Sequence, residues 1–227
     1  MEDLPGYQMP SFVNIIFIIR RCLMTLTHNQ RWEISGIILS GGKSQRMGED
    51  KSFIRIGEKP IIETITDLFQ KLFKETLIVT NRKDSYFYLK VGVYEDISPD
   101  QGALGGLYTG LFRSNFFNSF AVACDMPSLN AGVINYLCQE AEGYDVVVPR
   151  TEDGLQPLHA LYSKRCLEPI QSVLMEKKTR IVDFYPLVRV RVVEAREFLS
   201  IDPEMQSFVN INTPEELNRL KKRNAIT

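Results

Sequence analysis

The sequence predicts an α/β fold, a three-layer architecture with helices on both faces of a mostly parallel sheet. Short β-branched runs alternate along the chain with segments of helical periodicity, which is the pattern of such folds. The runs are apolar throughout, as is typical of strands buried on both faces. The 227 residues, 44% hydrophobic and 24% charged, have the composition of a folded protein that is long enough to bury a core.

Each element follows from its local pattern. Pro60 to Phe73 places apolar side chains at helical spacing, and its proline suits a first helical turn. Thr213, Pro214 and Glu216 form the start signal of a last helix, because Thr213 can cap it and Glu216 lies three residues later. The predicted strands are 34–40, 76–80, 91–94, 120–123, 145–148 and 188–193. The predicted helices are 60–73, 104–112, 131–141, 163–175 and 214–222.

Residues 1–33 differ from the rest and are interpreted as an N-terminal extension, which leaves 34–227 as a single domain. The apolar run Phe12 to Ile19 is about 8 residues long, against the roughly 20 that span a bilayer. Its basic pair Arg20-Arg21 follows the run, whereas a secretory signal begins with its positive charges. Two interpretations stay open: a non-functional extension with Met24 as the true start, or an amphipathic segment that binds a surface or a partner.

Charge and cysteine content exclude several classes of function. The 27 basic and 28 acidic residues give a net charge of −1, without the basic excess that proteins binding nucleic acid usually show, although a local basic pocket stays open. We therefore expect neither a nucleic acid nor a membrane as partner. No two cysteines form a C-x-x-C pair and only two histidines are present, which disfavours a structural zinc site. A cytoplasmic protein with reduced thiols is expected. The cysteines are Cys22, Cys124, Cys138 and Cys166.

The loop after the first predicted strand carries the strongest chemical signal. It reads LSGGKSQRMGEDK over residues 39–51. Its glycines let backbone amides approach an anion, and Arg46 and Lys51 add positive charge for phosphates. A P-loop is excluded, because that motif needs glycine where Ile37 stands. A dinucleotide fingerprint also fails, because Gly41 and Gly42 are adjacent.

This loop resembles the L-x-G-G-x-x-x-R-M-G-x-x-K signature of the nucleotidyltransferases related to molybdenum cofactor guanylyltransferase. Four further segments resemble that family in the same order: Asn81-Arg82, GALGGL at 102–107, CDMP at 124–127 and NINTPEEL at 210–217. Together they cover roughly residues 34–222. The chain departs from the family pattern at Ala103, where proline is usual, and at Ser40, where alanine is common. The fold implied is Rossmann-like and similar to the nucleotide-diphospho-sugar transferases.

The resemblance implies transfer of a guanylyl group from GTP to the phosphate of molybdopterin, with release of pyrophosphate. Such chemistry needs alignment and charge neutralisation. A phosphate monoester has a second pKa near 6, so the nucleophile is largely dianionic at neutral pH and needs no general base. Mg²⁺ is the expected cofactor. Transient protein partners that deliver molybdopterin or accept the product are also expected.

The resemblance also assigns roles to residues. Arg46, Lys51 and Asp125 are the predicted catalytic residues, the two cations neutralising triphosphate charge. Asp125 and Asp96 are the predicted magnesium ligands. Asn210 and Asn212 correspond to the segment near the pterin, whereas His159 is interpreted as structural. The predicted GTP-binding positions are Leu39, Ser40, Gly41, Gly42, Lys51, Asn81, Asp96 and Asp125.

Two alternatives remain at this point. One is a different nucleotidyltransferase of the same fold, a cytidylyltransferase for molybdopterin or for a small phosphorylated alcohol. The other is a module that binds GTP and molybdopterin without turnover. The adjacent pair Gly41-Gly42 and the segment at 210–217 favour the enzyme that uses GTP, as relatives that use CTP tend to have alanine-glycine in the first pair.

Overall fold

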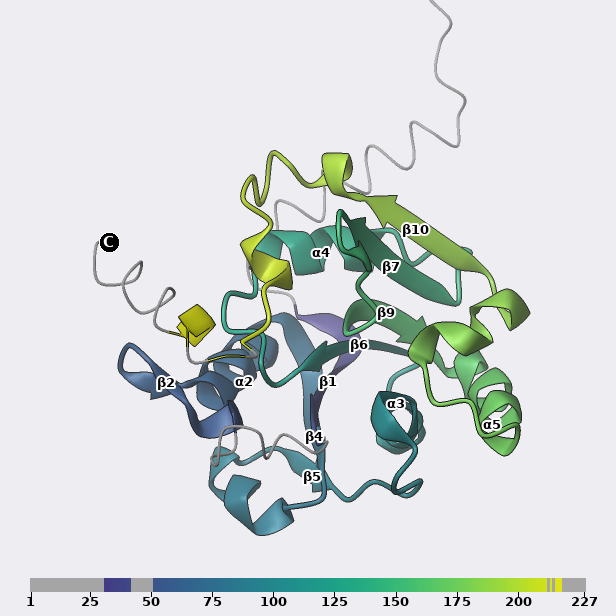
Figure 1. Ribbon diagram of the computed structural model, residues 1–227, viewed down its shortest axis with the longest axis horizontal. Coiled ribbons are helices and arrows are strands. Elements are labelled where there is room, and N and C mark those ends of the chain that lie inside the picture. The colour runs from purple at the N-terminus through teal and green to yellow at the C-terminus, as the bar shows by residue number, and fades with distance from the viewer. Residues whose placement is uncertain (1–30, 42–50, 212, 214, 218–227) are drawn as a thin grey trace, which may run out of the picture. The chain divides into compact units, whose positions relative to one another are not determined.

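A computed structural model describes residues 31–41, 51–211, 213 and 215–217. In this part of the chain eight strands form one sheet, in the order β10-β7-β9-β6-β1-β4-β5 with β8 paired to β7 (Figure 1). The strands are β1 Trp32–Ser40, β4 Phe73–Thr80, β5 Gly92–Tyr94, β6 Asn118–Ala123, β7 Val146–Thr151, β8 Gly154–Leu155, β9 His159–Ser163 and β10 Val190–Glu194. A separate hairpin consists of β2 Arg55–Ile56 and β3 Lys59–Pro60.

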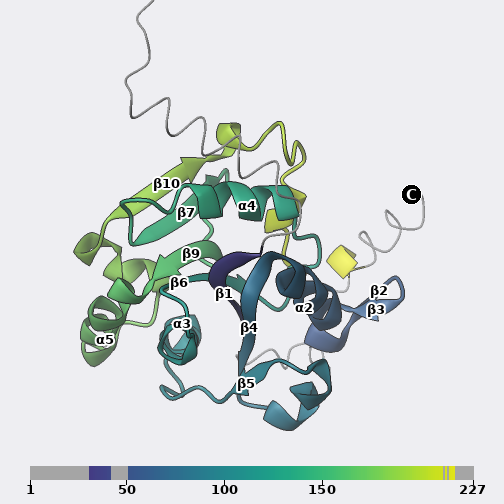
Figure 2. The same cartoon turned by 180° about the vertical axis from the view of Figure 1, so that it is seen from behind.

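Helices cover both faces of the sheet, as predicted. On one face α2 and α4 pack on one apolar cluster of the core, and on the other α3 and α5 pack on a second, an arrangement visible from both sides (Figures 1 and 2). The α-helices are α2 Ile61–Leu72, α3 Gly102–Arg113, α4 Ala131–Gln139 and α5 Leu167–Met175. The 3-10 segments are η2 Lys51–Phe53, η3 Lys83–Leu89, η4 Lys164–Cys166, η5 Ile181–Leu187, η6 Ala195–Glu197 and η7 Gln206–Phe208.

The sheet is parallel except for β9 and the short β8. β1 pairs in parallel with β4 and β6, and β10 pairs in parallel with β7. β9 is antiparallel to both β6 and β7, between which it lies. The chain turns back through β8 after β7 without a crossover helix, so β9 returns in the opposite direction. The predicted mostly parallel sheet is thus confirmed.

Most predicted boundaries differ from the structure by a few residues: β1, for example, begins at Trp32 and not at residue 34, and β7 continues past Pro149 to Thr151. The helix predicted at 60–73 is α2, Ile61–Leu72, and Phe73 already opens β4, because its extended backbone sets its ring between Phe69 and Phe120 in the core. The helix predicted at 163–175 begins only at Leu167, because Ser163 completes β9. The strand predicted at 188–193 is β10, Val190–Glu194.

The predicted start of the last helix is borne out in the described residues. The Thr213 hydroxyl accepts a hydrogen bond from the Glu216 amide at 3.2 Å, and the Thr213 amide donates one to the Glu216 carboxylate at 2.9 Å. This reciprocal pair is a capping box. No helix in the described ranges is long and apolar enough to cross a membrane.

Candidate active site

The carboxyl ends of four parallel strands align at one edge of the sheet. Ser40 at the end of β1 pairs with Thr80 at the end of β4, which is next to β5 and its last residue, Tyr94. On the other side of β1, Leu39 pairs with Ala123, the last residue of β6. Ligands of open α/β sheets bind beyond this edge. The segments that follow β1, β4, β5 and β6 therefore leave the sheet side by side.

Asp125 lies directly beyond β6 and carries the most unusual polar atom of this edge. Its Oδ1 is buried and has no hydrogen-bond partner in the described part of the chain. Burial raises the pKa of the Asp125 carboxyl, and the positive charge of Lys51 opposes that shift. Lys51 itself is only 8% exposed, which is unusual for a lysine. A buried carboxylate oxygen without a donor is a position that a cation or a ligand proton would satisfy.

The C-terminal segment reaches the same place. The Ile211 amide donates a hydrogen bond of 2.9 Å to the Asp125 carbonyl, and Ile211 is fully buried. Its neighbour Asn210 is exposed. About 85 residues separate Asp125 from Ile211 in the sequence, so only the fold brings Asn210 to the end of β6. Asn212 lies outside the described residues.

Asp96, the second predicted magnesium ligand, lies in the loop between β5 and α3. Its Oδ1 accepts hydrogen bonds from the Ser98 amide at 2.9 Å and from the Thr109 hydroxyl at 2.7 Å. A methyl group at Gly105 would lie 2.6 Å from the Ser98 carbonyl oxygen and 3.3 Å from Asp96 Oδ2, so glycine is required there. One oxygen of Asp96 thus holds the loop against α3, and Oδ2 is the oxygen left for a ligand.

The other predicted nucleotide-binding residues divide into three groups. Leu39 is 8% exposed and packs among the core residues under α3, so only its backbone can serve a ligand; its carbonyl accepts a hydrogen bond from the Cys124 amide at 3.0 Å. Asn81 and Gly41 are exposed. A Cβ at Gly41 would meet nothing within 4 Å, so packing does not demand this glycine. Gly42 and Arg46 lie outside the described residues.

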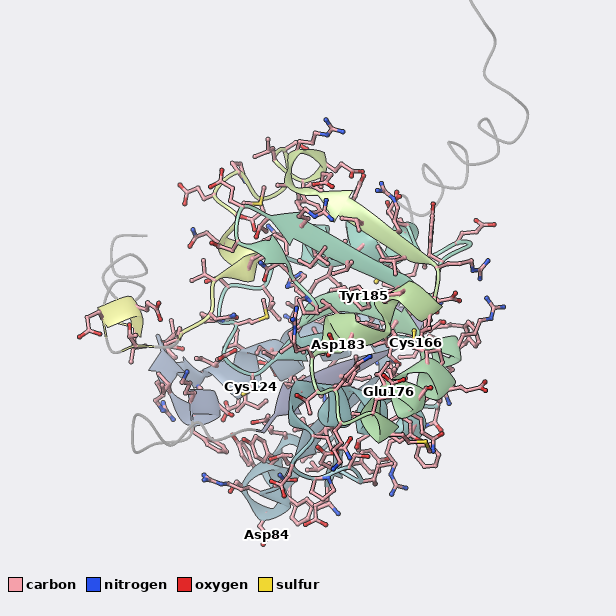
Figure 3. All side chains as sticks on the ribbon, turned by 45° about the vertical axis from the view of Figure 1, so that its right-hand side comes forward. Asp84, Cys124, Cys166, Glu176, Asp183 and Tyr185 are labelled. Atoms are coloured by element: carbon pink, nitrogen blue, oxygen red, sulfur yellow. The ribbon has the colours of Figure 1, made fainter. Side chains whose placement is uncertain are left out.

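The histidine and cysteine side chains in the described part of the chain do not gather at this edge of the sheet. His159 is fully buried at the start of β9, which agrees with its structural interpretation. Cys124, beside Asp125, and the buried Cys166 lie well apart (Figure 3). Burial raises the pKa of the Cys166 thiol to about 12, so it stays protonated and unreactive. In the described part of the chain no three His, Cys, Asp or Glu side chains group as metal ligands.

Sequence reasoning missed two residues of this edge, Ser52 and Tyr86. Both are fully buried, and their hydroxyls contact that of Ser40. Ser52 follows Lys51 directly, and this position is the one feature of the sequence that points to Ser52. Tyr86 lies 34 residues further on and carries no local signature.

Comparison with known proteins agrees with this architecture. Residues 36–188 match the MobA-like NTP transferase domain. A protein of Pelotomaculum thermopropionicum named probable molybdenum cofactor guanylyltransferase is 35% identical over 185 residues, which cover 82% of this chain and 90% of that protein.

Several solved structures share the fold. The structure of molybdopterin-guanine dinucleotide biosynthesis protein A from Archaeoglobus fulgidus superposes with a TM-score of 0.74 at 23% identity, over 86% of this chain and all of that one. The 4-diphosphocytidyl-2C-methyl-D-erythritol synthase of Anaerococcus prevotii gives a TM-score of 0.66 at 13% identity, over 85% and 96% of the two chains.

Proposed function

Because the chain belongs to the MobA-like NTP transferase family, we propose that it transfers the guanylyl group of GTP to the phosphate of molybdopterin. An oxygen of that phosphate forms the new bond to the α-phosphorus of GTP, and the bond from this phosphorus to the β-phosphate bridging oxygen breaks. Pyrophosphate leaves with the electron pair of that bond. The relative from Pelotomaculum thermopropionicum carries the name of this activity and matches most of both chains.

The observation that carries the proposal is the environment of Asp125. Its buried Oδ1 without a donor and the buried Lys51 bring an acceptor and a cation to the end of β6. The transfer creates charge on the α-phosphate and on pyrophosphate, and preorganised charges in a site shielded from water stabilise such a transition state. The chain's own contribution is therefore to align two phosphates and neutralise them.

Magnesium fits this site. The Asp125 oxygen is a hard ligand in need of a partner, and Asp96 Oδ2 is the second carboxylate oxygen of the same edge. Mg²⁺ in phosphoryl transfer commonly uses one or two carboxylates and completes its shell with phosphate oxygens and water, which agrees with so small a ligand set. When bound, the ion would draw negative charge from the α-phosphate and from the leaving pyrophosphate.

The two substrates would approach from different segments. Gly41 and Lys51, at the two ends of the glycine-rich loop, would receive the triphosphate, and the exposed Asn81 offers an amide to the base or ribose. Asn210 would face the pterin, because Ile211 attaches its segment to the backbone of Asp125. In this arrangement the reacting phosphates meet beside Asp125.

A panel of nucleotides tests the proposal. The purified full-length protein is incubated with Mg²⁺, molybdopterin and each of GTP, CTP, ATP and UTP, and pyrophosphate release is measured. We expect release with GTP, and only in the presence of molybdopterin. Release with CTP alone would reject the guanylyl assignment in favour of a cytidylyltransferase. Tight binding of GTP without release under any condition would instead indicate a binding module.

A further inference from the structure

Three buried hydroxyl groups form a closed cluster at the end of β1. Ser40 Oγ lies 2.7 Å from Ser52 Oγ and 2.6 Å from the hydroxyl of Tyr86, and the Tyr86 hydroxyl donates to Ser52 Oγ at 3.0 Å. Ser40 is 6% exposed, and the other two are completely buried. We call Ser40, Ser52 and Tyr86 the hydroxyl cluster. Each hydroxyl can donate one hydrogen bond and accept two, so three of them can satisfy one another without water.

The hydroxyl cluster closes the glycine-rich loop at its base. Ser40 precedes the first glycine of that loop, Gly41, and Ser52 follows its last cation, Lys51. The contact between the two serines thus joins positions 12 residues apart and holds both ends of the loop together. Joining the ends of such a segment costs conformational entropy, which these buried contacts help to offset.

Tyr86 attaches this base to a third part of the edge. It belongs to η3, which follows β4, and its ring packs on Phe53 with a centroid distance of 5.1 Å. Asp84, two residues earlier in η3, points away from the body of the protein (Figure 3), whereas the Tyr86 side chain is directed inward. The ring contributes packing, and the hydroxyl adds the link to both serines.

The segment held in this way carries Lys51. The Lys51 carbonyl accepts a hydrogen bond from the Ile54 amide at 3.2 Å, so the turn that follows Lys51 is ordered as η2. The positive charge of Lys51 acts on Asp125 at the end of β6. A shift of the backbone at Ser52 would therefore move this charge relative to Asp125.

We propose that Tyr86 is a positioning residue for the nucleoside triphosphate. Its hydroxyl, through Ser40 and Ser52, sets the spacing between the backbone at Gly41 and the ammonium group of Lys51. The proposal rests on the proposed function, because it assumes that the glycine-rich loop receives the triphosphate. Tyr86 touches no reacting group in this scheme, and its hydroxyl acts through its contacts with the two serines.

The test compares two tyrosine variants that lose the same atom. Tyr86→Phe removes the hydroxyl and keeps the ring. Tyr162→Phe is the matched control, because Tyr162 is also fully buried and its hydroxyl also has two partners, the Pro157 carbonyl at 2.6 Å and the Tyr185 hydroxyl at 3.0 Å. KM for the nucleotide, KM for molybdopterin, kcat and Tm are measured for both variants and for the wild type.

We expect Tyr86→Phe to raise KM for the nucleotide about three- to ten-fold, the range that the loss of one or two hydrogen bonds produces. KM for molybdopterin should stay as in the wild type. Tyr162→Phe should lower Tm to a similar extent and leave both KM values unchanged. If Tyr86→Phe affects only Tm, as the control does, the hydroxyl has a merely structural role and the proposal is overturned.

Ser52→Ala approaches the same link from the other side and serves if Tyr86→Phe does not fold. It should raise KM for the nucleotide as well, and the double variant should add little to the single changes, because both remove one pathway. Fully additive effects would contradict action through Ser52.

The assays use whichever nucleoside triphosphate the wild type turns over. If the wild type turns over another nucleotide but not GTP, the proposed substrate is rejected and the comparison of the variants still applies. A wild type that turns over none of the four nucleotides would overturn both proposals.

Discussion

Replacing His159 by leucine should flatten the acid side of the stability profile. His159 is completely buried, with its ring 5.4 Å from that of Phe120 and 4.8 Å from that of Phe208 between centroids. Neither ring nitrogen has a hydrogen-bond partner in the described part of the chain. Burial lowers the pKa of the imidazole to about 3, and the Asp202 carboxylate and the backbone of Ser207 oppose that shift only in part. The folded protein therefore holds this histidine neutral.

The size and sign of the effect follow from proton linkage. In the unfolded chain the imidazole has a pKa near 6.5, so above that pH both states are neutral and His159 adds no pH dependence. As the pH falls below 6.5 the unfolded state binds a proton that the folded state refuses until about pH 3. Each pH unit in this window lowers the free energy of unfolding by about 1.4 kcal/mol. At pH 4.5 the total loss relative to neutral pH is therefore about 2.7 kcal/mol.

Urea unfolding of the wild type and of His159→Leu at pH 7.5, 5.5 and 4.5 measures the effect. At pH 7.5 the two proteins should differ by about 1 kcal/mol or less, because leucine fills a similar volume and the imidazole makes no hydrogen bond that is lost. At pH 4.5 the variant should gain about 2.7 kcal/mol relative to the wild type. Carboxylates titrate in both proteins and cancel in the difference. A difference that is the same at all three pH values would refute the reasoning.

Two further substitution pairs test the site and the packing. Asp125→Asn should lower pyrophosphate release about 100-fold or more while leaving Tm equal or higher, because burial disfavours the charged Asp125 carboxylate more than Lys51 favours it. Asp145→Asn, whose carboxylate accepts from Arg189 and Arg165, should lose about 1–3 kcal/mol of stability and keep activity. A drop in Tm for Asp125→Asn that matches Asp145→Asn would contradict this. Gly110→Ala should lower the free energy of unfolding in urea by about 1–3 kcal/mol, because its Cβ would lie 2.6 Å from Ile37. Gly106→Ala should be neutral or stabilising, because its Cβ would lie 3.5 Å from Leu39, at ordinary contact distance. Equal effects of the two substitutions would argue against the close contact between Gly110 and Ile37.

The elements with strong local signals were predicted well. The strand beginning at Ile34 and the helix after Pro60 are β1 and α2 within a few residues, because apolar periodicity reports directly on burial. The capping box at Thr213 and Glu216 was equally readable, since both partners lie within one turn. The antiparallel direction of β9 and its place between β6 and β7 were not predicted, because they depend on pairings between residues up to about 45 positions apart.

The candidate site also has features that the sequence predicts and features that only the structure shows. The sequence already places Gly41, Lys51 and Asp125 in loops that follow predicted strands. Such loops meet at one edge of a parallel sheet, so their proximity could be predicted. The structure added the use of Asp96 Oδ1 by Ser98 and Thr109, which leaves one oxygen for a ligand. No local pattern predicts such bonds, because a carboxylate before a turn looks the same in the sequence whether it is engaged or not.

The order of residues along the chain was enough to establish the class of fold, the family and the residue types of the triphosphate loop, since each depends on near neighbours. Which buried groups lack a partner and which distant residues touch emerged only from packing. Ile211 bonds to the backbone of Asp125, and Tyr86 joins Ser40 to Ser52. Such contacts form where strands and helices dock, and their free energy depends on burial and geometry that no short stretch of sequence encodes.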